Sequence, residues 1–97
     1  MNREDIAEIN PEALFCDGFD EAIIGIAERI NLGPVVAYDV EKIIEILKKD
    51  MQVEPDDIYE GRTEEDVKIE MAYDYFYYNI QNAWMGEFTP IFVTKTE

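Results

Sequence analysis

The chain has 97 residues and a formal net charge of −15, from 23 acidic and 8 basic residues, with no histidine and one cysteine. Without histidine it cannot build a Ser/His/Asp or a Cys/His catalytic arrangement, and one cysteine is too few for a structural zinc site or an intrachain disulfide. Because so acidic a chain repels phosphate groups, we expect no direct contact with nucleic acid or with an anionic membrane.

The first part of the chain is expected to hold short helical turns and then a β-hairpin. Residues 3–16 are typical of short turns of helix, because Asn10 can cap a helix just before a proline. The apolar run 22–29 is interrupted by a glycine and is followed by loop-type residues and by the β-rich run 35–38. This pattern favours an antiparallel hairpin. A helical stripe within 20–30 is the alternative. The residues of the first segment that we expect to face inward are Ile6, Ile9, Ala13 and Leu14.

Two helices follow the hairpin. Residues 40–51 come directly after Asp39, a good N-cap, and place apolar side chains three and four residues apart. An acidic loop, 52–62, then leads to a second helix over 63–85, which begins with a threonine cap and three acids in its first turn.

Together these elements predict an α+β fold in a single domain, residues 1–97. Because the chain has no apolar run long enough to cross a membrane and its first residues lack the features of a signal peptide, we expect a cytoplasmic protein. A single unpaired cysteine agrees with a reducing compartment. The predicted architecture is a small antiparallel sheet of about three strands, 22–29, 35–38 and 90–94, packed against two helices, 40–51 and 63–85.

The second helix carries two apolar faces, so contacts on two of its sides are expected. The first face contains Ile69, Ala72, Tyr73, Phe76, Ile80 and Ala83. The second face contains a stripe that is a candidate self-association surface, because tyrosine is enriched at protein interfaces. The residues of this second stripe are Val67, Met71, Tyr75 and Tyr78.

Two segments carry almost all of the negative charge. Residues 1–28 and residues 54–74 each contribute −7, whereas residues 29–53 are neutral and residues 75–97 contribute −1. The neutral middle and the aromatic end are therefore expected to form most of the packed body.

Within the second charged segment, three carboxylates recur every four residues along the predicted helix. Asp66, Glu70 and Asp74 would then lie on one face, with a rise of about 6 Å per step. Such a row imitates the regular charge of a nucleic-acid backbone and would attract a basic protein. A solvated helix face without a partner is the alternative. The candidate partner-binding residues are Glu54, Asp56, Asp57, Glu60, Glu64, Glu65, Asp66, Glu70 and Asp74.

Three sequence blocks occur in a fixed order: DGFDEAIIGI over 17–26, YDVEKIIEIL over 38–47 and YFYYNIQNAWMGEFTPIF over 75–92. In that order they resemble a family of small acidic proteins that is common in bacteriophage and prophage genomes and has no assigned function. This chain departs from the family by a longer and more acidic stretch around 52–68. The resemblance implies a phage source and action in the cytoplasm of a bacterial host, and it supplies no catalytic residues.

The acidic segments do not predict a metal or catalytic site. Neither 17–21 nor 54–57 matches the EF-hand pattern, so we predict no metal and no cofactor. Pairs of carboxylates are unavoidable in so acidic a chain, and we assign none of them an acid–base role.

These patterns lead to the hypothesis of a non-catalytic, phage-type protein that binds a basic host protein. The partner would be a nucleic-acid-binding protein, and the chain would act as a nucleic-acid mimic or as an inhibitor of a host defence component. The alternative is a structural or accessory protein that assembles into a homo-oligomer, in which the acids only maintain solubility.

Overall fold

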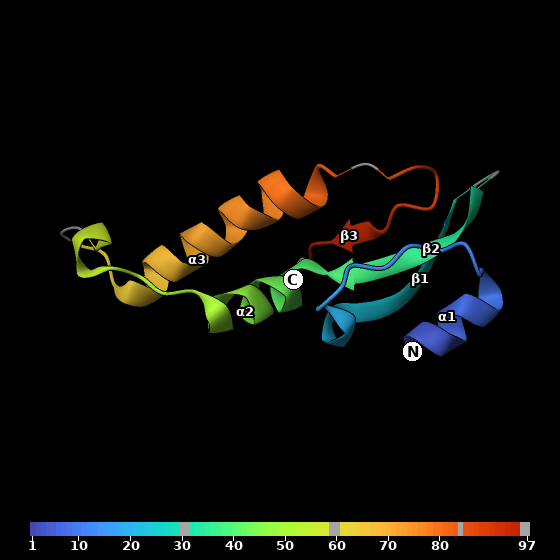
Figure 1. Cartoon of the computed structure of the whole chain (residues 1–97), viewed down its shortest axis with the longest axis horizontal. Coiled ribbons are helices and arrows are strands. Elements are labelled where there is room, and N and C mark those ends of the chain that lie inside the picture. The colour runs from blue at the N-terminus through green and yellow to red at the C-terminus, as the bar shows by residue number, and fades with distance from the viewer. Residues whose placement is uncertain (30–31, 59–60, 84, 96–97) are drawn as a thin grey trace. The chain divides into compact units, whose positions relative to one another are not determined.

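A computed structural model confirms the predicted α+β class, with a three-stranded sheet and several helices (Figure 1). It divides the chain into two compact units, one comprising 1–43 with 84–97 and the other comprising 44–83. We describe each unit by itself. The residues that the structure describes are 1–29, 32–58, 61–83 and 85–95.

The sheet belongs to the first unit. Strands β1 (Ile23–Arg29) and β2 (Leu32–Asp39) form the predicted antiparallel hairpin, so the helical alternative for this segment is wrong. Strand β3 (Ile91–Val93) lies beside β2 and gives the order β1-β2-β3 (Figure 1). The pairing of β3 with β2 is parallel, which corrects the antiparallel expectation. Parallel neighbours need a long crossover connection, and the residues between these two strands, which include the whole second unit, provide it.

The middle strand β2 supplies most of the core of the first unit. Val35, Val36, Ala37 and Tyr38 are all buried, as expected for a strand with a neighbour on each side. The Tyr38 ring stacks on Phe92 of β3 with 6.0 Å between ring centroids. The Tyr38 hydroxyl accepts a hydrogen bond of 2.8 Å from the backbone N–H of Cys16, and burial raises the pKa of this phenol to about 12.

The N-terminal helix α1 (Arg3–Ile9) ends where we expected a helix to begin. Its N-cap is Asn2, and Asn10 is its C-cap. The Asn10 amide donates a 2.6 Å hydrogen bond to the carbonyl of Pro34 in β2, so Asn10 ties this turn to the hairpin. Ile6 is buried as predicted, but Ile9 is 45% exposed because it lies in the last turn of the helix.

Helix α2 (Val40–Asp50) begins where β2 ends and confirms the predicted helix. Asp39 caps it, since its Oδ1 accepts a 3.0 Å hydrogen bond from the N–H of Glu41. The other oxygen, Oδ2, lies 3.1 Å from Nζ of Lys95, which follows β3. A single carboxylate therefore fixes the start of the helix and holds the C-terminal segment. The short 3-10 helix η1 (Asp20–Ala22) precedes β1 in the same unit.

In the second unit, helix α3 (Glu64–Tyr75) is capped by Thr63 as predicted. The predicted α-helix to Met85 is wrong in its last part, because residues Phe76–Gln81 form a π-helix, η3, and the helix ends there. A π-helix has i→i+5 hydrogen bonds and thus a wider turn, which changes the face on which each later side chain lies. The predicted loop before α3 contains a short 3-10 helix, η2 (Pro55–Asp57).

The buried Tyr38 phenol predicts a loss of stability at alkaline pH. Because its pKa is raised in the folded protein, the stabilisation is complete below about pH 10, where the phenol is neutral in both states. Above that pH the Tyr38 phenol ionises in the unfolded chain before it does so in the folded protein, so the free energy of unfolding should fall by roughly 2 kcal/mol as pH approaches 12. Chemical denaturation at several pH values measures this loss.

The matched variant for this prediction is Tyr38→Phe. It removes the hydrogen bond from Cys16 and should cost about 1 kcal/mol near neutral pH. It should also remove the part of the alkaline loss that is due to Tyr38. Tyr78→Phe, which removes an exposed phenol, serves as the control. An alkaline loss of equal size in wild type and Tyr38→Phe would contradict the assignment to Tyr38.

Candidate partner-binding surface

The predicted partner-binding acids that the structure describes all lie in the second unit and are exposed. Glu54 and Asp56 lie at and within η2, and the other five lie on α3. The side chain of Asp57, and Glu60 as a whole, lie outside the described residues. The exposed acids of α3 are Glu64, Glu65, Asp66, Glu70 and Asp74.

Three of the acids on α3 form ion pairs within the second unit. Glu64 Oε1 lies 3.5 Å from Nζ of Lys68, one helical turn further along. Glu65 pairs with Lys48 of α2. Glu70 pairs with Arg62, which precedes the helix. These cations reduce the negative field at the three glutamates, so the surface is less uniformly acidic than the sequence spacing predicts.

Asp66 serves the helix itself. Its carboxylate accepts a 3.2 Å hydrogen bond from the N–H of Thr63, and its own N–H donates at 3.1 Å to the Thr63 hydroxyl. This capping box satisfies two backbone N–H groups at the start of α3. The predicted row of three equal carboxylates therefore divides into a helix cap at Asp66, an ion pair at Glu70 and a third member, Asp74. Among the described residues, Asp74 has neither a cation nor a hydrogen-bond donor as a partner.

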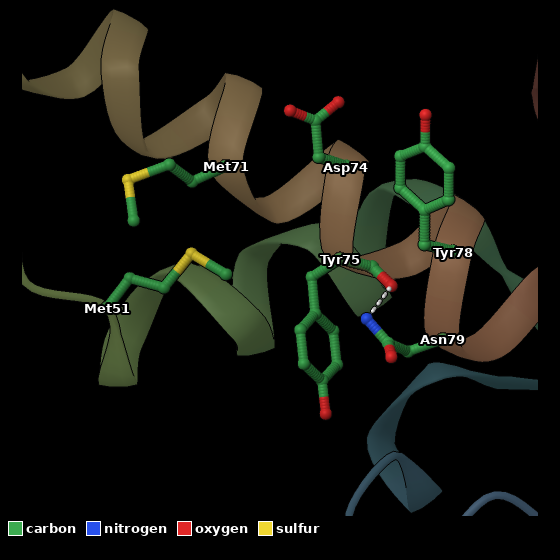
Figure 2. Close-up of a pocket in the computed structure, with 6 residues that line it drawn as sticks. All are labelled: Met51, Met71, Asp74, Tyr75, Tyr78 and Asn79. Carbon is green, nitrogen blue, oxygen red and sulfur yellow. Dashed lines mark hydrogen bonds between the residues drawn. The ribbon is translucent and has the colours of Figure 1, made fainter.

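Asp74 borders an open pocket of about 360 Å³ in the second unit. Met51, which directly follows α2, and Met71 of α3 point toward each other at this pocket (Figure 2). Asp74 and Tyr78 extend to the same side of the helix, whereas Tyr75 extends to the other side (Figure 2). The lining residues are Met51, Met71, Asp74, Tyr75, Tyr78 and Asn79.

The π-helix builds one wall of this pocket. The side-chain amide of Asn79 donates a 3.2 Å hydrogen bond to the carbonyl of Tyr75, at the junction between α3 and η3 (Figure 2). Tyr77 packs on two other rings, with centroid distances of 6.1 Å to Tyr73 and 5.5 Å to Phe76. These contacts hold the wider turn in place, and Tyr78 projects from it.

The predicted self-association stripe is exposed except at its first member. Val67 is 5% exposed, so it belongs to the buried side of α3. Met71, Tyr75 and Tyr78 are 36%, 48% and 79% exposed, respectively. The pocket joins these three residues to Asp74, which our sequence analysis had placed on a separate, acidic surface.

Two pocket residues, Met51 and Asn79, were not among the predicted site residues. Met51 is the last residue of the predicted helix over 40–51, and it lies one residue beyond the end of α2. Asn79 belongs to neither of the predicted apolar faces of the second helix, so the face pattern did not select it.

Comparisons with protein-family models, with curated proteins and with solved structures found no match for this chain. In the part of the chain that the structure describes, no helix is long and apolar enough to cross a membrane. Within the same residues, no group of three or more acidic or cysteine side chains is arranged to hold a metal ion. The arrangement found here is thus a surface with exposed carboxylates and a tyrosine- and methionine-lined pocket.

The different roles of Asp66 and Asp74 predict different effects on stability. Asp66→Ala should lower the free energy of unfolding by about 1 kcal/mol, because it removes the carboxylate that accepts the hydrogen bond from the N–H of Thr63 in the capping box. Asp74→Ala removes a carboxylate that has no ion pair or hydrogen bond among the described residues, and it should change stability by less than about 0.5 kcal/mol. Chemical denaturation of the two variants measures the difference, and equal losses would show that Asp74 also has a structural role.

Proposed function

We propose that this chain is a non-catalytic binding protein that uses the acidic surface of its second unit to contact a basic protein. The observation that carries the proposal is the position of Asp74, an exposed carboxylate without a described partner, at the edge of a pocket lined by tyrosine and methionine. Side chains of these types are enriched at the centres of protein interfaces.

The charge of the second unit supports a cationic partner. Residues 44–83 contain eleven acids and four bases, a net charge of −7. Three acids of the candidate surface form no ion pair among the described residues: Glu54, Asp56 and Asp74. Their charge is therefore available to an approaching protein. Complementary charge raises association rates and selects against acidic competitors.

The resemblance to phage proteins suggests where such a partner would be found. A nucleic-acid-binding protein of a bacterial host has a basic surface, and an acidic phage protein that occupies this surface would inhibit it. We therefore propose action in the host cytoplasm against a nucleic-acid-binding protein, for example a defence component. The ion pairs at Glu64, Glu65 and Glu70 mean that the contact would centre on the carboxylates that remain, rather than on a continuous row.

Capture from a bacterial lysate on immobilised protein tests this proposal, with the salt raised from ~0.05 to ~0.5 M. Wild type should retain basic proteins at low salt and release most of them at high salt. A variant with Glu54→Gln, Asp56→Asn and Asp74→Asn should retain about ten-fold less of the partner than wild type, because it removes the three carboxylates that form no ion pair among the described residues. Retention of proteins that are not basic, or retention indifferent to salt, would contradict the proposal.

The control variant carries Glu8→Gln, Glu12→Gln and Glu28→Gln. These three acids are exposed and lie in the first unit. Because each variant neutralises three acids, the control variant has the same net charge as the test variant. It should retain the partner nearly as well as wild type. Equal losses in both variants would mean that total charge, and not the surface of the second unit, determines binding.

A second candidate function is self-assembly, which the exposure of Met71, Tyr75 and Tyr78 favours. If these side chains join copies of the chain, sedimentation at micromolar concentration should show an oligomer that Tyr75→Ser with Tyr78→Ser dissociates. Because each copy carries −15, added salt should strengthen such an oligomer. A wild-type monomer at both low and high salt would eliminate this candidate.

A further inference from the structure

We propose that the pocket of the second unit binds an arginine side chain of a basic protein, with the guanidinium on the ring of Tyr78 and beside the carboxylate of Asp74. This inference rests on the proposed function and names the chemical group that the acidic surface recognises. It is carried by the composition of the pocket, by the missing partner of Asp74 and by an arginine site that the chain builds for itself.

The pocket combines an apolar wall with a single charged side chain. Met51 and Met71 supply an apolar wall, and Asp74 is the acidic residue of the described lining. This combination suits a side chain with an apolar stem and a cationic end. Arginine fits better than lysine, because the guanidinium is planar, is weakly hydrated and stacks on aromatic rings, whereas an ammonium is a compact and strongly hydrated charge.

The two recognition groups line the same pocket and extend in the same direction. Asp74 and Tyr78 are four residues apart and extend to the same side of the helix (Figure 2). A guanidinium within about 6 Å of a ring centroid is attracted by the ring, and its N–H groups remain free to donate to a carboxylate in the plane beside it. Tyr78 is 79% exposed, so its ring face is accessible to another protein.

The first unit contains a completed site of this kind. The guanidinium carbon of Arg3 lies 4.8 Å from the ring centroid of Phe15. Its Nε donates to Asp20 at 2.8 Å, and its Nη2 donates to Asp17 at 3.2 Å. An aromatic ring and carboxylates thus hold an arginine of the same chain.

In the second unit, the corresponding ring and carboxylate have no arginine among the described residues. Arg62, the arginine of that unit, pairs with Glu70, one turn before Asp74. A second copy of the chain is a poor occupant, because each copy carries a net charge of −15 and has 23 acids against 8 bases. Charge complementarity therefore favours an arginine from a basic partner over self-association at this pocket.

Two synthetic probes of equal length and charge test the inference: an arginine–glycine peptide and a lysine–glycine peptide. Calorimetric titration at low salt should show that the wild-type chain binds the arginine peptide about five-fold more tightly than the lysine peptide. Asp74→Asn should weaken arginine-peptide binding about ten-fold. Tyr78→Leu should abolish the preference for arginine, whereas Tyr78→Phe, which keeps the aromatic face, should retain it.

Asp56→Asn is the matched charge control, since Asp56 is exposed in the same unit and does not line the pocket. It should weaken both peptides equally and slightly. Because Tyr78 is exposed, circular dichroism and thermal midpoints of its variants should match wild type.

The outcomes separate this inference from the proposed function. Salt-sensitive binding of both peptides with equal affinity, unchanged by Tyr78→Leu, would overturn the arginine site and leave the acidic surface as the proposed contact. Failure of both peptides to bind at low salt would overturn the arginine site and the proposed function together. An oligomer that Tyr78→Leu dissociates, without any preference for arginine, would assign the pocket to a second copy and overturn the inference.

Discussion

Burial of β2 on both sides is the constraint on which the first unit depends. As the middle strand, β2 contributes Val35–Tyr38 to the core; β1 pairs with it along most of its length and β3 pairs with its last residues, Ala37–Asp39. The residue after this run, Asp39, uses one carboxylate oxygen to cap α2 and the other to hold Lys95. The end of a buried strand thus sets the first residue of α2, and the same carboxylate forms an ion pair with the segment after β3.

The distribution of the few cations gives the acidic chain distinct surfaces. In the first unit, Arg3 forms ion pairs with Asp17 and Asp20. In the second unit, Lys48, Arg62 and Lys68 each neutralise one glutamate of α3. A surface ion pair contributes little to stability, typically below about 1 kcal/mol. Its larger effect here is on recognition, because it removes some carboxylates from the field that an approaching protein meets and leaves Asp74 beside an apolar pocket.

Local signals in the sequence predicted the elements well. The apolar runs around Gly25 indicated the hairpin, and Asp39 and Thr63 marked the starts of α2 and α3, because caps and strand-type residues act over a few positions. The parallel direction of β3 was not predictable in this way, since it depends on a connection of many residues rather than on the strand itself.

The site was predicted only in part, for a similar reason. Spacing placed Asp66, Glu70 and Asp74 on one helix face but gave no information on their partners, which come from elsewhere in the chain or from the cap. The π-helix was also hidden, because nearly every residue from Tyr73 to Tyr78 is aromatic, and such a run fits two apolar faces of an α-helix as well as it fits a wider turn. Tyr78 lies in this π-helix and lines the same pocket as Asp74. Without the π-helix, the sequence placed the acids and the tyrosines on two separate surfaces.

The late position of β3 in the chain has a consequence for folding. The β1–β2 hairpin needs only neighbouring residues, so it can form early, as contacts close in sequence do. The partner of β2 on the other side is the last strand, and loop-closure entropy opposes its pairing until the residues between have become ordered. During synthesis on the ribosome, the outer edge of β2 therefore stays open until residues 91–93 have emerged. For that interval the nascent chain exposes an apolar strand edge, and its strong negative charge then protects it from pairing with other copies.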